Sequence, residues 1–247
     1  MTQTRSGVFI AAAALALSAH PAAAQRSPSA GVEFSNDEVR RGLSWSGGRA
    51  ALSTDVWGVL GPVEASARAA TTRGSERHAG ADAVIDVALA SSWNLGPLQM
   101  RTGLTGHLFT GAREAMDYAE LGASASYSYG PAQLTGGVEF APSQDAIGGS
   151  NLHLYVNANA GIPGTPFTLI AGLGHSSGST SDPVRAQRLR PDGNYANWRL
   201  GAEHRRGALT LAVDYLGTDI SRGDFAGPYA DRAHASDRII GRIRYDF

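Results

Sequence analysis

Serine and histidine are the residues in this chain that most readily suggest catalysis, since a Ser–His pair can supply a nucleophile and its general base. His107 and His153 lie on the polar face of segments in which polar and apolar residues alternate. The remaining candidates fall in loops or at tight turns: His78, His175, His204 and His234. No serine shares an apolar face with a histidine, as a lipid hydrolase embedded in a membrane would require. We therefore expect no catalytic residue.

Cofactor and metal chemistry is also disfavoured by composition. The chain has no Cys, which excludes thiolate metal sites and thiol nucleophiles, and all 21 of its basic residues are Arg, which excludes a Schiff-base lysine. A net charge of −1 without a basic stripe argues against nucleic acid as a partner. The stretch "PDGN" at 191–194 lacks the alternating carboxylates of a calcium loop and is typical of a turn. We expect neither a metal nor a cofactor.

Charged residues recur at every second position, opposite an apolar face. In the final stretch "RIIGRIRYDF", arginines alternate with isoleucines and aromatics. A polar face of this kind holds water, and its charges would act on ions that pass along it. We predict that these charged and polar residues line a pore: Glu33, Asp55, Arg68, Asp86, Arg101, Glu120, Glu139, His153, Arg199, Asp214, Arg238, Arg242 and Arg244.

The arginines near the C-terminus allow two interpretations. Arg199, Arg238, Arg242 and Arg244 could form a basic wall opposite Glu120 and Glu139, with a field across the pore that orients polar solutes. Alternatively, they could pair locally with Glu33, Glu203 and Asp214 and brace the wall. The sequence leaves both open.

Alternation over about ten residues is typical of a β-strand with one apolar and one polar face, and ten residues suffice for a tilted strand to cross a bilayer. We count twelve such segments. Tight turns join them in pairs, at "LGP" 60–62, "LGP" 95–97 and "YGP" 129–131, about 35 residues apart. Longer polar loops lie around 175–194 and 217–235. The sequence predicts an all-β fold: an up-and-down antiparallel transmembrane β-barrel of about 12 strands, with short periplasmic turns and longer extracellular loops.

Aromatic residues on the apolar faces fall at two levels, as in the girdles of a lipid-facing surface. One level lies near the short turns: Trp93, Tyr127, Tyr129, Phe167, Tyr245 and Phe247. The other lies near the long loops: Phe34, Phe140, Trp198 and Tyr215. Trp57 is an exception, since its place in the alternation points inward. The terminal aromatic strand resembles the C-terminal signal of bacterial outer-membrane barrels, so we predict that Tyr245 and Phe247 are read by the barrel assembly machinery.

The N-terminal residues are typical of a secretory signal peptide. Arg5 precedes an apolar stretch at 8–19 that is too short to span a bilayer, and Ala22 to Ala24 fit an A-x-A cleavage site. We predict a cleaved signal peptide over residues 1–24 and a barrel domain over residues 25–247. With the two girdles, this export signal predicts the outer membrane of a Gram-negative bacterium.

Two stretches resemble the TorF family of porins, exported proteins of proteobacteria. "FSNDEVRRGLSWS" is similar to that family's Ser-x-Asp and Arg-Gly-x-Ser element, here Ser35, Asp37, Arg41, Gly42 and Ser44, although Glu38 stands where an aromatic is expected. "NYANWRLGAEHRRGALTLAVDYLGTDI" is similar to a Tyr-x-x-Trp-x-x-Gly strand and the hairpin after it, here Tyr195, Trp198, Gly201, Thr218 and Asp219. The resemblance implies a porin-like channel.

The expected function is passive diffusion of small polar solutes through the barrel, without enzymatic activity. Small residues on the polar faces favour an open, narrow lumen, and the alternative is a lumen closed by ion pairs or an infolded loop. A closed barrel would have a structural or adhesion role through its long loops. A lipid-modifying hydrolase is a third alternative.

The expected partners are outer-membrane lipid and lipopolysaccharide, the assembly machinery and the solutes themselves. Lipopolysaccharide phosphates could bind the arginines of "RAQRLR", which are Arg185, Arg188 and Arg190. A solvated run of charges is the alternative interpretation of this stretch.

Overall fold

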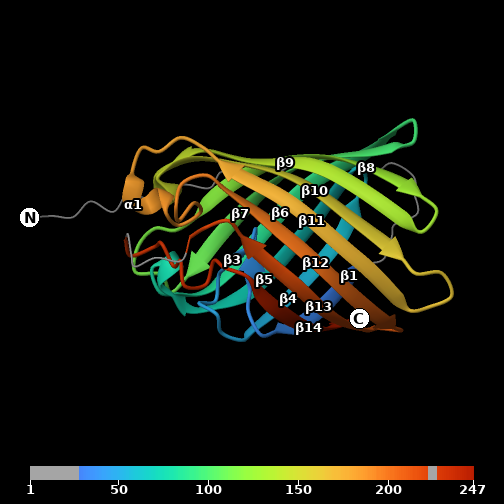
Figure 1. The fold of residues 1–247 in the computed structure, drawn as a ribbon. Helices are drawn as coiled ribbons and strands as arrows, with labels where there is room; N and C mark the ends of the chain where they lie inside the picture. The colour runs from blue at the N-terminus through green and yellow to red at the C-terminus, as the bar shows by residue number, and fades with distance from the viewer. Residues whose placement is uncertain (1–27, 222–226) are drawn as a thin grey trace, which may run out of the picture.

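The protein folds into a closed β-barrel of twelve antiparallel strands, as the alternation predicts (Figure 1). The structure, a computed structural model, describes residues 28–221 and 227–247, so the predicted signal peptide lies outside the described residues. The barrel strands, in chain order, are β1 (Ser29–Ser35), β4 (Ala51–Leu60), β5 (Val63–Ser75), β6 (Ala81–Leu95), β7 (Leu98–Thr110), β8 (Tyr118–Tyr129), β9 (Ala132–Gln144), β10 (Gly149–Gly161), β11 (Phe167–Ser177), β12 (Tyr195–Arg206), β13 (Leu209–Thr218) and β14 (Arg238–Asp246).

Each barrel strand pairs with its neighbours in sequence, and the first and last strands close the ring. β1 pairs with β4 on one side and with β14 on the other, where Val32 lies opposite Tyr245. The backbone N–H of Phe247 donates to the carbonyl of Ala30 at 2.8 Å, so the pairing extends to the last residue. Closure removes the open edge, which lipid does not tolerate. That Tyr245 and Phe247 direct assembly stays a prediction.

The strand ends alternate between short turns and long connections, which lie at opposite ends of the barrel (Figure 1). Three of the short turns contain two residues, Gly-Pro, and the glycines at 61, 96 and 130 have φ near +60°. A left-handed first residue matches the twist of the flanking strands and favours glycine. The long connections contain η1 (Glu76–His78), η2 (Asp145–Ile147) and α1 (Pro183–Ala186).

The outward face carries the apolar side chains, and nine of the ten aromatics predicted for the two girdles are exposed there. Near the short turns these are Trp93, Tyr127, Tyr129, Phe167, Tyr245 and Phe247, and near the long loops they are Phe34, Phe140 and Tyr215. Trp198, predicted at the same level as Tyr215, is half-buried. The exposed side chains are stable only where lipid covers them. His175 and His204 do not lie in a loop and a turn as expected, because β11 and β12 extend through them.

The lumen is not open along its full length, contrary to the expectation from its small residues. Residues 36–50, which connect β1 to β4, fold into the barrel and form a two-stranded hairpin of β2 (Val39–Arg40) and β3 (Leu43–Ser44). We call residues 36–50 the lumen segment. Leu43 and Trp45 from this segment pack with Tyr118, Leu189 and other buried residues beneath the long loops. The hydrophobic core therefore fills the long-loop end of the barrel.

Candidate functional site

The thirteen residues predicted to line a pore all lie on the inward face of the barrel. The pairing register shows this, since Glu33 lies opposite Arg244, Asp55 opposite Arg68, and Arg199 opposite Leu216. On each strand the alternate positions carry the exposed apolar side chains. Which residues of each strand face the lumen therefore follows from the two-residue period of a β-strand. That these residues act on solutes stays a prediction.

The arginines near the C-terminus are neutralised by acidic residues beside them, which is the second of the two interpretations. The Arg242 guanidinium donates to Asp214 at 3.0 Å, to Glu203 at 3.0 Å and to Glu33 at 3.2 Å. Arg199 also donates to Asp214, at 2.7 Å. A continuous basic wall is absent from this side of the lumen, because acidic side chains lie between the arginines.

Arg244 and Arg238 are also paired with acidic residues. Arg244 donates to Asp55 at 2.6 Å and to Asp246 at 2.7 Å. Arg238 reaches the lumen segment, where it donates to Asp37 at 3.2 Å and to the carbonyl oxygen of Gly42 at 2.5 Å. Ion pairs along this wall thus both brace the strands and hold the lumen segment.

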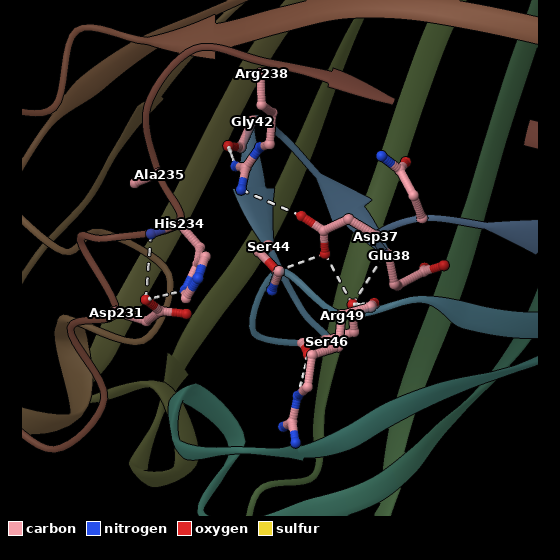
Figure 2. Close-up of polar contacts among 12 residues, drawn as sticks. Asp37, Glu38, Gly42, Ser44, Ser46, Arg49, Asp231, His234, Ala235 and Arg238 are labelled. Atoms are coloured by element: carbon pink, nitrogen blue, oxygen red, sulfur yellow. Dashed lines mark hydrogen bonds and ion pairs between the residues drawn. The ribbon is translucent and has the colours of Figure 1, made fainter. Parts of the chain in front are cut away.

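The base of the lumen segment is organised around the carboxylate of Asp37. Ser44 and Ser46 donate their hydroxyl protons to one Asp37 oxygen, at 2.6 and 2.8 Å, and Arg238 binds the other oxygen (Figure 2). Asp37, Ser44 and Ser46 are all buried. Short polar side chains that bond one another in this way hold the two ends of the hairpin together.

The tip of the lumen segment crosses the barrel. Arg41 donates to both oxygens of Glu120, at 3.0 and 2.5 Å, and to Glu139 at 2.6 Å. Arg40 binds Asp86 on β6 at 2.7 Å. Glu120 and Glu139 are therefore paired with Arg41 of the lumen segment and not with the C-terminal arginines, as the basic-wall interpretation required.

A second set of contacts joins the lumen segment to β5. Arg68 donates to both oxygens of Glu38, at 2.7 and 2.8 Å, and Arg40 shares one of these oxygens at 3.1 Å. Burial opposes the charge on Glu38, but the hydrogen bond from Arg68 and the charge of Arg40 lower its pKa below the ordinary value. The carboxylate is therefore ionised at neutral pH, and its ion pairs are intact.

The alternation of polar and apolar residues does not predict the lumen positions of Asp37, Glu38, Arg40 and Arg41. A signal was present, since Val39, Leu43 and Trp45 are large apolar residues in a connection that should be polar. Apolar side chains at the end of a barrel need burial, and the interior is where this connection can find it.

Two of the cavities inside the barrel lie on either side of the lumen segment. The larger has a volume of about 550 Å³ and is lined by polar and charged groups, among them Glu33, Asp214 and Tyr155. The smaller, of about 270 Å³, lies beneath Leu189 and Tyr195. Arg40, Arg41 and Glu139 line both, so these three side chains form the partition between them.

Above the smaller cavity, the long connections pack into a loop cap, defined here as residues 76–80, 145–148, 183–190 and 228–235. Two fully buried arginines hold it together. Arg77 donates to the carbonyl oxygens of Ser44, Arg188 and Asp231 at 2.6–2.9 Å. Arg188 donates to the carbonyls of Met116 and Ala146 at 2.6 and 3.0 Å. Burial lowers the pKa of each arginine to about 10, so both remain charged at neutral pH.

Two of the three arginines of "RAQRLR" are structural, so the stretch is not a solvated run of charges as a whole. Arg188 is buried in the loop cap, and Arg190 donates to the carbonyl oxygens of Gly178 and Ser179 at 2.9 and 2.6 Å. Arg185 pairs with Glu114 at 2.7 Å. The donors of Arg188 and Arg190 are directed at the protein itself, whereas Arg185 lies at the surface. That this stretch binds lipopolysaccharide stays a prediction.

His78 makes the loop cap sensitive to pH. It is fully buried and accepts a hydrogen bond from Arg188 Nε to its Nδ1 at 3.1 Å. Burial and the charges of Arg188 and Arg77 lower its pKa well below the ordinary 6.5. The unfolded cap therefore binds a proton below that pH that the folded cap does not, so the cap loses stability as the pH falls, by at most about 1.4 kcal/mol per unit.

We expect the long loops of the wild type to become more susceptible to protease between about pH 7.5 and 5, because of this linkage. Limited proteolysis of the folded barrel measures the effect. His78→Gln is the control, since glutamine can accept the Arg188 hydrogen bond but does not titrate, and its cleavage rate should stay flat. An equal pH dependence in both proteins would contradict the assignment to His78.

The other inward histidines pair with wall residues. His107 lies 2.7 Å from Asp86 and stacks on Tyr118, and His153 lies 3.0 Å from the Ser176 hydroxyl. Both are buried on the lumen side, away from the lipid-facing surface. Within residues 28–221 and 227–247, no cluster of three or more His, Asp or Glu side chains could hold a metal ion. In the same ranges, no helix is long and apolar enough to span a membrane.

Two solved outer-membrane proteins share this architecture. KdgM porin superposes with a TM-score of 0.58 at 6% identity, covering 89% of this chain and 99% of that one. The COG4313 outer membrane channel from Pseudomonas putida F1 superposes with a TM-score of 0.52 at 10% identity, covering 93% and 99%. At such identities the likeness concerns the fold alone.

Sequence comparison places the chain more directly. No curated protein matches it. A family model, described as a bacterial protein of unknown function (Gcw_chp), matches residues 19–243, nearly the whole chain. The protein belongs to the Gcw_chp family.

Proposed function

We propose that the protein is a channel of the Gram-negative outer membrane that passes small polar solutes by diffusion. The observation that carries the proposal is the cavity of about 550 Å³, which is lined by charged and polar side chains inside a barrel with an apolar outer face. Such a lumen hydrates a solute while the wall excludes lipid. The channel fold of the two structural neighbours and the resemblance to TorF porins support the same function.

The lumen segment limits what this channel would pass. It lies across the barrel and is tied to strands on several sides through Arg41, Arg40 and Arg238. A solute has to pass the partition formed by Arg40, Arg41 and Glu139. Only ions and small polar molecules fit beside such a barrier, so the expected conductance is well below that of an unobstructed barrel.

Planar-bilayer recording of the purified protein tests this function, with a deletion variant as the reference for an open lumen. Ser35 pairs with Ala51, so removing residues 38–48 leaves a four-residue hairpin loop between paired strands. The wild type should give small current steps and the deletion variant steps several times larger. If neither protein conducts, although both shift on gels when heated as folded barrels do, the channel function is wrong.

A closed barrel that acts through its loops is the second candidate. The buried arginines of the loop cap favour it, because they hold the long connections in one rigid surface. Current through the deletion variant together with a silent wild type, at all voltages and salt concentrations, would favour this candidate.

A further inference from the structure

We propose that the Arg41 side chain is a gate: bound to Glu120 and Glu139 it shuts the lumen, and swung aside it leaves a throat that prefers cations. The inference rests on the proposed channel function, and it concerns how that channel is regulated and which ions it selects. It requires movement of one side chain and leaves the hairpin backbone in place.

The backbone of the hairpin is built to aim Arg41 across the lumen. Arg40 pairs with Leu43, so Arg41 and Gly42 form a two-residue turn, and both have positive φ, 51° and 77°. These values are those of a type I′ turn, where asparagine and glycine are favoured and arginine is not. A non-glycine residue in the left-handed region is costly and persists where its surroundings hold it. The cost is consistent with a requirement for this side chain at this point.

The turn itself is anchored independently of the ion pairs. The Tyr195 hydroxyl donates to the Arg41 carbonyl oxygen at 3.0 Å, and Arg238 donates to that of Gly42. The Asp37 network fixes the base of the hairpin. Release of the Arg41 guanidinium therefore leaves the hairpin standing, and the long, flexible side chain is the part that can move.

Arg41 also lies where the internal spaces meet. Glu139 lines three cavities, of about 550, 270 and 70 Å³, and Glu120 lines the two smaller ones. The guanidinium binds both carboxylates, and so it lies at the junction. The Glu139 side chain is 39% exposed, so water and ions in the lumen can compete for it. Withdrawal of Arg41 would join the cavities.

The charges left at the junction determine the selectivity. Around it the carboxylates of Glu38, Asp86, Glu120 and Glu139 face the guanidinium groups of Arg40, Arg41 and Arg68. With Arg41 swung aside, four carboxylates face two arginines and His107, which lies 2.7 Å from Asp86 and 3.5 Å from Glu120. Even with His107 protonated, the negative charges are in excess. A narrow lumen with excess negative charge attracts cations and repels anions.

Arg41→Asn is the decisive variant, because asparagine keeps the type I′ turn and removes the charge. We expect the time-averaged current to rise roughly tenfold or more. A factor of ten corresponds to about 1.4 kcal/mol by which the ion pairs of Arg41 favour its closed position. The reversal potential in a salt gradient should shift toward that of the cation.

The matched control is Arg73→Asn. Arg73 precedes Gly74 in the same left-handed conformation, φ 57° and 67°, but is exposed outside the lumen. Among the described residues, Arg73 touches the lumen segment only at its end, where it donates to the Ala50 carbonyl and where Arg49 donates to the Arg73 carbonyl, and it has no contact with Glu120 or Glu139. The current of Arg73→Asn should equal that of the wild type.

Salt dependence gives a second measurement that needs no mutation. Screening weakens a partly exposed ion pair, so wild-type current should rise more steeply with salt than bulk conductivity does. Arg41→Asn should follow bulk conductivity. Glu139→Gln, which leaves the Glu120 pair in place, should give an intermediate current and a weaker cation preference, and it serves if Arg41→Asn fails to fold.

Failure of the gate is distinct from failure of the channel. If the wild type and the variant without residues 38–48 both conduct, but Arg41→Asn and Glu139→Gln behave as the wild type, the gate is wrong and the channel stands. If the current rises in Arg41→Asn with a shift toward anions, the predicted selectivity is wrong. If the deletion variant is silent as well, the channel function itself fails.

Discussion

Leu154→Arg should destabilise the barrel by about 2–4 kcal/mol, because the side chain lies on the lipid face near the middle of β10 and a charge there loses its hydration. Leu154 is 49% exposed in the absence of lipid and lies opposite His175 and Val138 on the outward face. Val213→Arg on β13, where the valine is 58% exposed, should cost a similar amount. Urea unfolding in lipid vesicles, followed by the mobility shift of the folded barrel on gels, measures both.

The matched controls lie on the same strands and face the lumen. Asn157 on β10 lines the larger cavity, and Thr210 on β13 lies opposite Arg244. Arginine at either position remains in water, so Asn157→Arg and Thr210→Arg should cost much less than the lipid-facing variants. Equal losses at both kinds of position would mean that the outer face is not in contact with lipid.

Arg188→Met should loosen the loop cap by roughly 3 kcal/mol. Methionine fills a similar volume, but the carbonyls of Met116 and Ala146 and the Nδ1 atom of His78 lose their donor while still buried. Each unsatisfied buried acceptor costs about 1–3 kcal/mol, and relief of the buried charge offsets part of the sum. The measurement is the protease concentration that cleaves the long loops of the folded barrel.

Arg185→Met on the same segment is the comparison. Arg185 pairs with Glu114 and Asp182 at the surface, and exposed ion pairs of this kind contribute about 0–1 kcal/mol. The barrel strands should stay intact in both variants, so the heat-dependent mobility shift should persist. Similar protease resistance in Arg188→Met and the wild type would show that the buried arginine is not what holds the cap.

The strands and their inward charges could be predicted because both depend on local alternation. The inward position of Arg242, for example, needs only its place between Gly241 and Ile243. The pairing of charged residues that lie far apart in the chain cannot be predicted from this alternation. Arg41 binds Glu120 and Glu139, which lie 79 and 98 residues away, and nothing in the period of either strand points to them.

Small residues on the inward face predict an open lumen because small side chains leave space beside the wall. That space, however, can be occupied by other side chains. Gly137 illustrates the point, since a Cβ there would lie only 2.3 Å from the ring of Tyr155 on the neighbouring strand. The absence of a side chain at Gly137 leaves room for the ring of Tyr155 to pack against the wall. Residue volume at one position therefore does not measure free space, because a neighbour or a loop can use the space.

The contact between Asp37 and Arg238 joins residues 201 positions apart in the chain, one just after the first strand and the other at the start of the last (Figure 2). The lumen segment therefore depends on the last strand, because Arg238 at the start of β14 binds the Asp37 carboxylate at its base and the Gly42 carbonyl at its tip. A barrel that still lacks its final strand would have an incompletely anchored lumen segment as well as an open seam. The strand that closes the barrel wall therefore also supplies an anchor for its interior.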